Sequence, residues 1–327
     1  MIILRFNINK FFGSGHLFRC LMLYDLINEN NSEKILLIKR DNLFFNKFSG
    51  LLKFKNFLAF NKSGEEFNII KKILSKHNSS KKNVIVLDIK DTDLEYVKKL
   101  KSIGLKIISI DDLGSGRNSV DLLIDANIHN EKSSRNRLFG EKFILLNPVY
   151  SKINSKHKKI RKKIKSAILF FGGSDPAGIA DFLISNLKKI NFYGWKITLI
   201  TASEKINSMK PQKNIHVLKP ELNSAELAKL YYNSDIAVIS GGISLYETMC
   251  TGTPSIVINQ NSEQLRNSNF YNNCILNAGI FNPDDFVTKL NDFFIKISDY
   301  KTRLNLSINS KLKIDGLGYK RIINKIN

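Results

Sequence analysis

The first candidate site residues lie near the start of the chain, in the run Gly13-Ser14-Gly15-His16-Leu17-Phe18-Arg19. Glycine lets a ligand approach the backbone closely, and the helix that this run is expected to open offers unpaired N–H groups and a partial positive charge at its N-terminus. We therefore expect Gly13, Ser14 and Gly15 to contact a phosphate. The same positive charge disfavours an imidazolium, so His16 should be neutral near pH 7 and able to accept a proton.

Arg19 lies one turn after His16 and could meet a phosphate or a carboxylate. The run lacks the third glycine of the GxGxxG pattern, and no acidic residue follows a second strand at the usual place, which argues against a dinucleotide site. A simpler interpretation stays open, in which the glycines form a turn and His16 caps the helix.

A second glycine turn, Gly172-Gly173-Ser174-Asp175-Pro176, also separates a predicted strand from a predicted helix. Two flexible glycines, a hydroxyl and open N–H groups can cradle an anion, so we expect Gly172, Gly173 and Ser174 to contact a diphosphate. The alternative is a plain turn in which Ser174 or Asp175 caps the following helix.

A third glycine turn, Gly241-Gly242-Ile243-Ser244, is followed by Glu247. Here Gly241, Gly242 and Ser244 would hold a diphosphate while the Glu247 carboxylate accepts two ribose hydroxyls. The alternative is a capping box between Ser244 and Glu247. Beyond the next strand, Glu263 and Gln264 should lie at the same edge of the sheet. Three such turns at strand-to-helix junctions indicate a phosphorylated ligand.

Strands and helices are expected to alternate along the chain, once through each half. The predicted strands are short apolar runs and the predicted helices have apolar residues at a spacing near 3.6. The predicted strands cover 1–6, 34–38, 83–87, 106–110, 120–124, 166–171, 195–200, 215–218, 236–240 and 254–258. The predicted helices cover 17–28, 65–77, 91–103, 176–189, 225–232, 244–250, 263–273 and 284–297.

This alternation predicts the α/β class, because parallel strands need helical crossovers. We expect two Rossmann-like domains that face each other across a cleft, since ligands of open α/β sheets bind at the carboxyl ends of the strands. The basic stretch 151–163 is the expected boundary, giving an N-terminal domain over 1–155 and a C-terminal domain over 156–327, with a C-terminal helix that returns to the N-terminal domain.

The composition agrees with two globular domains. The chain has 327 residues, of which 43% are hydrophobic, and this excludes a wholly disordered protein. The formal net charge is +22, but the lysines are scattered, so we expect no nucleic-acid partner. Three cysteines without a CxxC pair indicate a reducing compartment without structural zinc.

The chain has no apolar run long enough to span a membrane and no signal-peptide pattern, so we expect a cytoplasmic protein. The Phe- and Lys-rich segment 43–60 leaves a peripheral membrane contact open, with a helix packed on the sheet as the alternative. The sequence leaves the oligomeric state open.

The remaining candidates are weaker. Asp111 and Asp112 follow a predicted strand and could bind sugar hydroxyls or cap a turn. No metal-ligand spacing, GxSxG elbow or Walker loop is present, so we expect no metal and no cofactor. The other histidines are isolated and are interpreted as surface or packing residues: His77, His129, His157 and His216.

The ordered set of motifs resembles the UDP-sugar hydrolase family of pseudaminic acid biosynthesis and its spore-coat-polysaccharide relatives. Each motif is loose, but together they cover nearly the whole chain in the family's order. The matching segments are Gly13–Cys20, Ser109–Leu113 with Asp121–Leu123, Phe171–Pro176, Ser240–Glu247, Gly252-x-Pro254, Gln264, and Asp315–Gly318 with Arg321.

The resemblance implies a GT-B architecture and hydrolysis of a UDP-linked 2,4-diacetamido-2,4,6-trideoxyhexose, by attack of water on the anomeric carbon without a metal. His16 matches the family's catalytic histidine, the expected general base. Glu247 matches the ribose-binding carboxylate, and the glycine turns at 172–174 and 242–244 match diphosphate contacts.

Two positions depart from the family's pattern. Lys90 stands where the hydrolase has a catalytic-site tyrosine, and Glu263 stands where it has an asparagine. Lys90 could meet a phosphate or a sugar carboxylate, and Glu263 could receive a proton or a hydroxyl, so both are candidate catalytic residues. A GT-B glycosyltransferase, in which an acceptor hydroxyl replaces water, is the alternative function.

Overall fold

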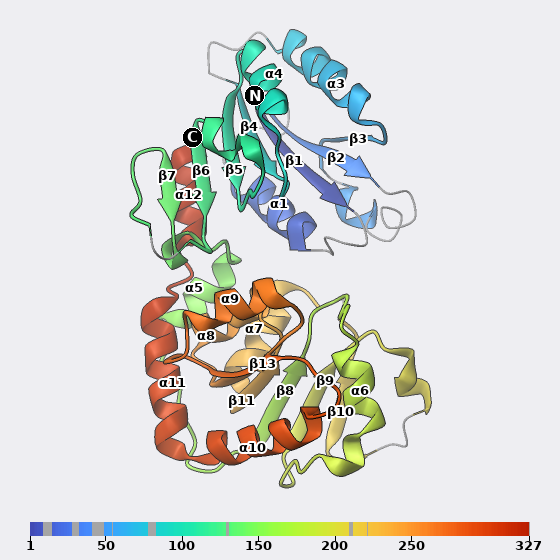
Figure 1. Ribbon diagram of the computed structural model, residues 1–327, viewed down its shortest axis with the longest axis vertical. Helices are drawn as coiled ribbons and strands as arrows, with labels where there is room; N and C mark the ends of the chain where they lie inside the picture. Colours follow the sequence, from blue (N-terminus) through green and yellow to red (C-terminus); the bar gives the residue numbers. More distant parts are fainter. Residues whose placement is uncertain are drawn as a thin grey trace. The chain divides into compact units, whose positions relative to one another are not determined.

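The computed structural model divides the chain into two compact units. It describes residues 1–8, 15–27, 33–40, 49–53, 55–77, 83–128, 131–208, 212–220 and 222–326. Unit 1 comprises Met1–Leu145 together with Gly318–Asn327, and unit 2 comprises Leu146–Leu317 (Figure 1). Two units of this kind are what the doubled alternation of strands and helices predicted.

Unit 1 is built on a parallel sheet with the strand order β3-β2-β1-β4-β5-β6-β7. All of its strand pairs are parallel. The order reverses at β1, and the inner strands are buried on both faces, as continuous apolar runs require. The strands are β1 (Ile2–Ile8), β2 (Lys34–Arg40), β3 (Phe57–Phe60), β4 (Val84–Asp88), β5 (Lys106–Ile110), β6 (Leu122–Asp125) and β7 (Arg137–Phe139).

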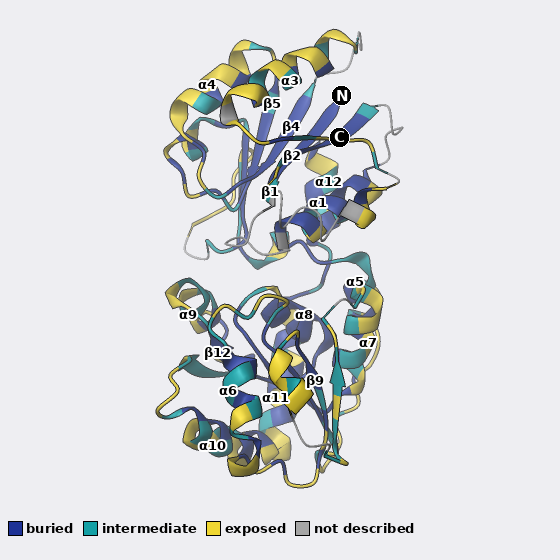
Figure 2. Cartoon of the chain, turned by 90° about the vertical axis from the view of Figure 1, so that its right-hand side faces the viewer, coloured by how far each residue is buried: buried dark blue, intermediate teal, exposed yellow. Residues whose placement is uncertain are grey.

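Helices α3 (Ser63–Ser75) and α4 (Leu94–Ser102) of unit 1 are buried on one side and exposed on the other (Figure 2). In α4, for example, Val97 and Leu100 are buried and Asp93 caps the first turn by accepting the Tyr96 N–H. The helices are α1 (Gly15–Leu26), α3 (Ser63–Ser75), α4 (Leu94–Ser102) and α12 (Gly318–Ile326), with shorter turns at Ser49–Leu52, Ser115–Ser119 and Glu141–Phe143.

The last helix belongs to the first unit, which confirms the predicted return of the chain. Arg321 donates a hydrogen bond to the Lys142 carbonyl, and Lys106 donates one to the Lys325 carbonyl. Gly318 packs so closely that a Cβ there would lie 2.1 Å from the Ile144 carbonyl oxygen. Only glycine fits this approach.

Unit 2 has a second parallel sheet with the order β10-β9-β8-β11-β12-β13. Its core includes the single tryptophan, Trp195, whose ring meets Phe294 edge to face. The strands are β8 (Ser166–Phe170), β9 (Lys196–Ile200), β10 (Ile215–Leu218), β11 (Ile236–Ile239), β12 (Ser255–Asn259) and β13 (Leu276–Ile280).

The helices of unit 2 differ in how far they are buried. Every residue from Ser244 to Thr251 in α8 is buried, which is typical of a helix inside a core. The helices are α5 (Pro148–Asn154), α6 (Ile179–Ser185), α7 (Ser224–Asn233), α8 (Ile243–Thr251), α9 (Ser262–Asn269), α10 (Phe286–Ser298) and α11 (Tyr300–Lys313), with shorter turns at Leu187–Lys189 and Glu204–Ser208.

The division between the units follows Leu145, whereas the sequence placed it after residue 155. The difference arises because α5 packs on α7 and α8 of unit 2. Its start carries a sequence signal, since Asn147 caps the helix and Pro148 is its first residue.

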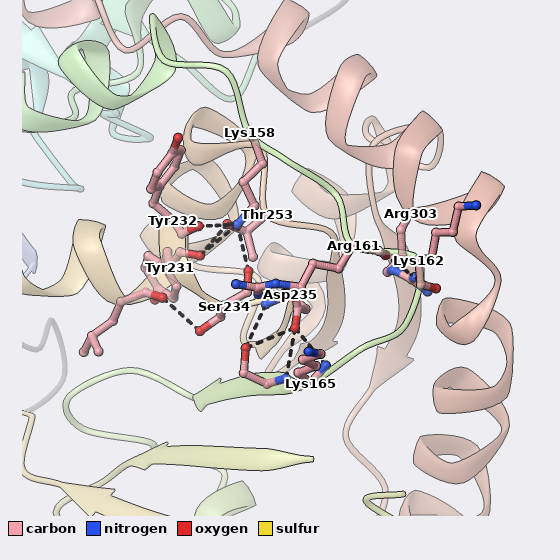
Figure 3. A network of polar contacts seen from close by, with 12 residues as sticks. Lys158, Arg161, Lys162, Lys165, Tyr231, Tyr232, Ser234, Asp235, Thr253 and Arg303 are labelled. Atoms are coloured by element: carbon pink, nitrogen blue, oxygen red, sulfur yellow. Dashed lines mark hydrogen bonds and ion pairs between the residues drawn. The ribbon is translucent and has the colours of Figure 1, made fainter. Parts of the chain in front are cut away.

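The basic stretch that follows α5 also belongs to unit 2. Lys158 is buried, and its ammonium donates to the carbonyls of Tyr231, Tyr232 and Ser234 at the end of α7 (Figure 3). Arg303 binds the carbonyls of residues 161 and 162. The stretch is thus tied to a helix end instead of forming a free connection.

No helix in the described part of the chain combines the length and the apolar character that a membrane crossing requires. The segment interpreted as a possible membrane contact is described only in part: residues 41–48 and 54 lie outside the described residues. Its described end forms the edge strand β3, where Phe57 and Leu58 are exposed.

Candidate functional site

His16 lies in the first turn of α1 and is held by a carboxylate from another strand. Its Nδ1 is 2.6 Å from Oδ1 of Asp88, the last residue of β4. Burial alone would raise the pKa of Asp88, but Arg19 and His16 outweigh it and hold that pKa well below its usual range. Asp88 is therefore ionised and can only accept hydrogen bonds. In a neutral imidazole the hydrogen would then lie on the Nδ1 of His16 and the lone pair on its Nε2.

Arg19 stands between two carboxylates of unit 1. Its Nε donates to Asp88 Oδ2 at 2.7 Å, and its Nη1 lies 2.5 Å from Asp111 Oδ2. Burial acts to lower the pKa of Arg19, but the two carboxylates raise it above its ordinary value. The predicted contact of Arg19 with a phosphate stays a prediction, while its carboxylate partners are visible here.

Carboxylates end three neighbouring strands of unit 1, namely Asp88 on β4, Asp111 after β5 and Asp125 on β6. Asp111 has a φ of 51°, in the left-handed region, where aspartate is among the better tolerated residues. Asp125 pairs with Arg117 at 3.2 Å. Burial and the charge of Asp111 raise the pKa of Asp125 to about 6. The three carboxylates at the carboxyl edge of this sheet are thus each paired with an arginine, Arg19 or Arg117.

The neighbouring Asp112 has a different part. It is completely buried and accepts hydrogen bonds from the Thr92 and Gly114 N–H groups and the Ser109 hydroxyl. It therefore joins the loops after β4 and β5. The sequence left open whether this acidic pair binds sugar hydroxyls or caps a turn. Asp112 caps a turn, whereas Asp111 keeps a partly exposed carboxylate beside Arg19.

Lys90 follows β4 by two residues and is partly buried. Its carbonyl accepts the Leu113 N–H at 2.9 Å, so the backbone of this loop is fixed against the loop after β5. Lys90 therefore lies just after the carboxyl end of β4, two residues from Asp88, as its position in the sequence predicted. Its catalytic role stays a prediction.

The first glycine turn is described only from its last residue. Gly13 and Ser14 lie outside the described residues, and Gly15 is the first residue of α1. The phosphate contacts expected of these three residues stay predictions.

The second glycine turn follows β8. Gly172 has a φ of 94°, and Gly173 and Ser174 are exposed. Asp175 accepts the N–H groups of Ile179 and Ala180, so its carboxylate caps α6. A diphosphate at this turn would meet the backbone of 172–174, because the first N–H groups of α6 are already taken.

The third glycine turn is tied to α9 by one side chain. Gln264 Oε1 accepts the N–H groups of Gly241 at 3.1 Å and of Gln260 at 2.9 Å. A Cβ on Gly241 would lie 2.1 Å from Asn259 Oδ1, so glycine is required there. Gly242 begins α8 as its N-cap, without a side-chain cap. The Gln264 side chain thus shapes the turn that the sequence predicted to bind a diphosphate.

Glu247 lies one turn after Ser244 in the buried helix α8. The helix begins after Gly242, so Ser244 is not its N-cap and the capping-box alternative does not apply. Burial raises the pKa of Glu247 to about 7, against smaller opposing effects of Tyr150 and Ser244. Its Oε2 is buried and has no hydrogen-bond partner among the described residues.

Glu263 lies in the first turn of α9 and is partly buried, next to Gln264. A carboxylate in a first turn stabilises a helix through its dipole. Glu263 belongs to unit 2, whereas His16 and Lys90 belong to unit 1. Its catalytic role also stays a prediction.

The sequence did not reveal three neighbours of the candidate site residues: Asp88 beside His16, and Tyr150 and Tyr231 beside Glu247. Asp88 ends a buried apolar strand, and that place in the sequence was an available signal. Among the described residues, no three histidine, cysteine, aspartate or glutamate side chains come together as a metal-binding group.

No protein-family model matches the chain. It is 24% identical over 268 residues to the spore coat polysaccharide biosynthesis protein SpsG of Bacillus subtilis, which covers 76% of this chain and 78% of SpsG. It is 22% identical over 270 residues to the uncharacterized protein MJ1062 of Methanocaldococcus jannaschii, which covers 77% of this chain. The match spans about half of MJ1062, 54% of its length.

Solved structures resemble the whole chain at low identity. Acinetobacter baumannii MurG has a TM-score of 0.65 at 8% identity, covering 99% of this chain and 98% of MurG. Staphylococcus aureus MnaA, solved with UDP, has a TM-score of 0.63 at 11% identity, covering 99% and 95%. The rhamnosyltransferase SpnG has a TM-score of 0.61 at 10% identity, covering 99% and 100%. The chain therefore has the fold of these proteins, with two Rossmann-like α/β units of the GT-B type, as its sequence predicted.

Proposed function

We propose that the protein is an enzyme of polysaccharide biosynthesis that acts on a UDP-linked sugar and breaks the bond between the anomeric carbon and the diphosphate. The role of SpsG in spore coat polysaccharide biosynthesis supports the pathway, and the UDP bound to MnaA supports the ligand class. The observation that carries the proposal is the 2.6 Å contact between His16 Nδ1 and Asp88, which orients a proton-accepting Nε2 at a strand end.

The chemistry proposed for His16 is general-base catalysis. A water molecule attacks the anomeric carbon, its proton passes to His16 Nε2, and the carbon–oxygen bond to UDP breaks. Asp88 stabilises the imidazolium that forms, because its negative charge lies against Nδ1–H. Arg19 also fixes Asp88, through one contact to each of its carboxylate oxygens.

Unit 2 supplies the nucleotide contacts in this proposal. The turn at Gly241 and Gly242 presents backbone N–H groups at the N-terminus of α8, which favours a phosphate. Glu247 accepts the ribose hydroxyls. Gln264 holds the turn in shape through its two hydrogen bonds.

We prefer hydrolysis as the reaction and a UDP-2,4-diacetamido-2,4,6-trideoxyhexose as the substrate class, because the motifs resemble those of the hydrolase family. Because Lys90 and Glu263 depart from the pattern of the resembling family, the sugar bound by this protein can differ from the sugar of that family. The stereochemistry of the hexose is the part of the proposal that a substrate panel decides.

The test is release of UDP from a panel of UDP-diacetamido sugars, without added acceptor. Wild-type protein should release UDP, and His16→Asn should release it about 10²–10⁴ times more slowly, the usual worth of a general base, while UDP binding is retained. His216→Asn, at an exposed histidine of β10, is the matched control and should keep wild-type turnover.

Turnover of His16→Asn at the wild-type rate would remove His16 from the mechanism. Release of UDP only after an acceptor alcohol is added would identify a glycosyltransferase. No UDP binding in any condition would overturn the nucleotide-sugar proposal.

A further inference from the structure

Three buried polar atoms around Glu247 form no well-aligned hydrogen bond among the described residues, although Tyr150 and Ser244 act on the Glu247 carboxyl as hydrogen-bonding neighbours. They are the hydroxyls of Tyr150 on α5 and Tyr231 on α7, and Oε2 of Glu247 on α8. Tyr150 is 1% exposed and Tyr231 is not exposed at all. These three helices pack against one another, and the pKa values of both phenols are raised by burial first and by the Glu247 charge second. The three groups therefore form one cluster, the Glu247 cluster.

Burying these polar groups destabilises the fold unless they find hydrogen-bond partners. A buried polar group without a partner costs about 1–3 kcal/mol, and native proteins keep few of them. The atoms are of two kinds, since each phenol can donate and accept, whereas Glu247 accepts when ionised and donates when protonated. A single proton thus decides which hydrogen bonds the cluster can form.

We propose that Tyr150 and Tyr231 are positioning residues for Glu247, and that nucleotide binding releases a proton from this carboxyl group to solvent. The inference rests on the proposed function, because it assumes that Glu247 accepts ligand hydroxyls. A carboxylate can accept two hydroxyl donors at once, whereas a protonated carboxyl must place its own hydrogen. Binding therefore selects the ionised form and needs no other reactant.

The groups that face Glu247 come from several elements. Tyr150 lies on α5, Tyr231 on α7, and Ser244 and Cys250 on α8 itself. None of these four is a cation. Burial raises the pKa of Glu247 to about 7, and Tyr150 opposes this rise. A substantial part of the ligand-free protein therefore carries the proton at neutral pH.

Lowering the pH below the pKa of Glu247 should weaken the binding of UDP. Below about pH 7 Glu247 is protonated, so the affinity for UDP should fall by up to tenfold for each further pH unit. Above that value the affinity should level off. Tyr150→Phe removes a group that lowers the pKa of Glu247, so its midpoint should move to higher pH while its affinity on the plateau stays within about twofold of wild type.

The experiment is calorimetric titration of the full chain with UDP over a pH series, in two buffers of different ionisation enthalpy. The β-phosphate of UDP also titrates near pH 6, so the proton release assigned to Glu247 is the difference between wild type and Glu247→Gln. That difference should approach one proton at low pH and vanish at high pH. Tyr231→Phe should shift the midpoint as well.

Tyr271→Phe is the matched control, because it removes a buried phenol of the same unit whose ring packs on Tyr246. It should leave the midpoint unchanged. Equal proton release by wild type and Glu247→Gln, or a Tyr150→Phe variant that loses affinity equally at every pH, would overturn the inference while UDP binding and the proposed function stand. No binding of UDP at any pH would overturn both.

Discussion

Among the individual side chains, the central feature is an imidazole whose Nδ1 is held by a buried carboxylate. Asp88 is 1% exposed and receives contacts from His16 and Arg19. In the proposed mechanism, this firmly held carboxylate makes the histidine at the helix start a directed base. The sequence was enough to identify His16 as a candidate base. It was not enough to identify Asp88 as its partner, because Asp88 lies 72 positions away along the chain.

Asp88→Asn tests this arrangement. The amide keeps the size of the side chain but presents N–H donors, so His16 can adopt the tautomer that carries hydrogen on Nε2 and accepts no proton there. We expect turnover to fall about 10²–10⁴-fold, the usual worth of general-base help, with UDP affinity within about twofold of wild type, measured by UDP release and calorimetry. The control is Asp91→Asn, at an exposed residue of the same loop. Wild-type turnover in Asp88→Asn would show that Asp88 does not set the tautomer.

Among the helices and strands, the C-terminal end of α7 shows how a buried cation stabilises a helix. The last carbonyls of a helix lack partners and attract a cation. Lys158 meets this need at the end of α7, and it also donates to Thr253, which connects α7 with the loop before β12 (Figure 3). A run of basic residues that resembles a solvated connection in the sequence therefore contains a buried structural lysine.

Lys158→Met tests the structural role of this lysine. The substitution keeps a long side chain but leaves the carbonyls of α7 without their donor, so the free energy of unfolding should fall by about 2–4 kcal/mol. Lys159→Met, at the exposed neighbouring position, should change it by less than about 0.5 kcal/mol. Denaturant titration gives both values. Equal stability of the two variants would argue against the capping role.

Element prediction failed where local signals conflicted. The edge strand β3 lies in a Phe- and Lys-rich region whose residues suit a strand or a helix, and pairing with β2 decides the matter. In α6 the predicted helix over 176–189 is shorter, because Asp175 caps it only at Ile179 and Ala180. The spacing of apolar residues is a poor predictor of a conformation that depends on pairing with a neighbouring strand or on a single capping side chain.

At the scale of the whole molecule, the chain begins and ends in the same unit. α12 packs on unit 1 through the close approach of Gly318 to the Ile144 carbonyl. Both the carboxyl edge with His16 and this packing belong to unit 1, while the Glu247 cluster belongs to unit 2. Each unit can thus be tested on its own chemistry within the full chain.

Gly318→Ala tests the packing of the returning helix. The added Cβ would lie 2.1 Å from the Ile144 carbonyl oxygen, so the backbone must shift and stability should fall by about 1–3 kcal/mol. Gly64→Ala is the control, because a Cβ there meets nothing within 4 Å. It should be neutral or stabilising, since alanine favours a helix over glycine. Thermal unfolding of both variants compares them. A Gly318→Ala protein as stable as wild type would mean that the helix can dock without this approach.

The alternation of strands and helices, the glycine turns at strand ends and the two-unit fold were all present in the sequence, because apolar periodicity and glycine placement act over a few residues. The contacts of Asp88, the carboxylate partners of Arg19 and the burial of Glu247 among two tyrosines were not. They depend on which strands become neighbours and on how helices from distant parts of the chain pack, and those relations exist only after the chain has folded.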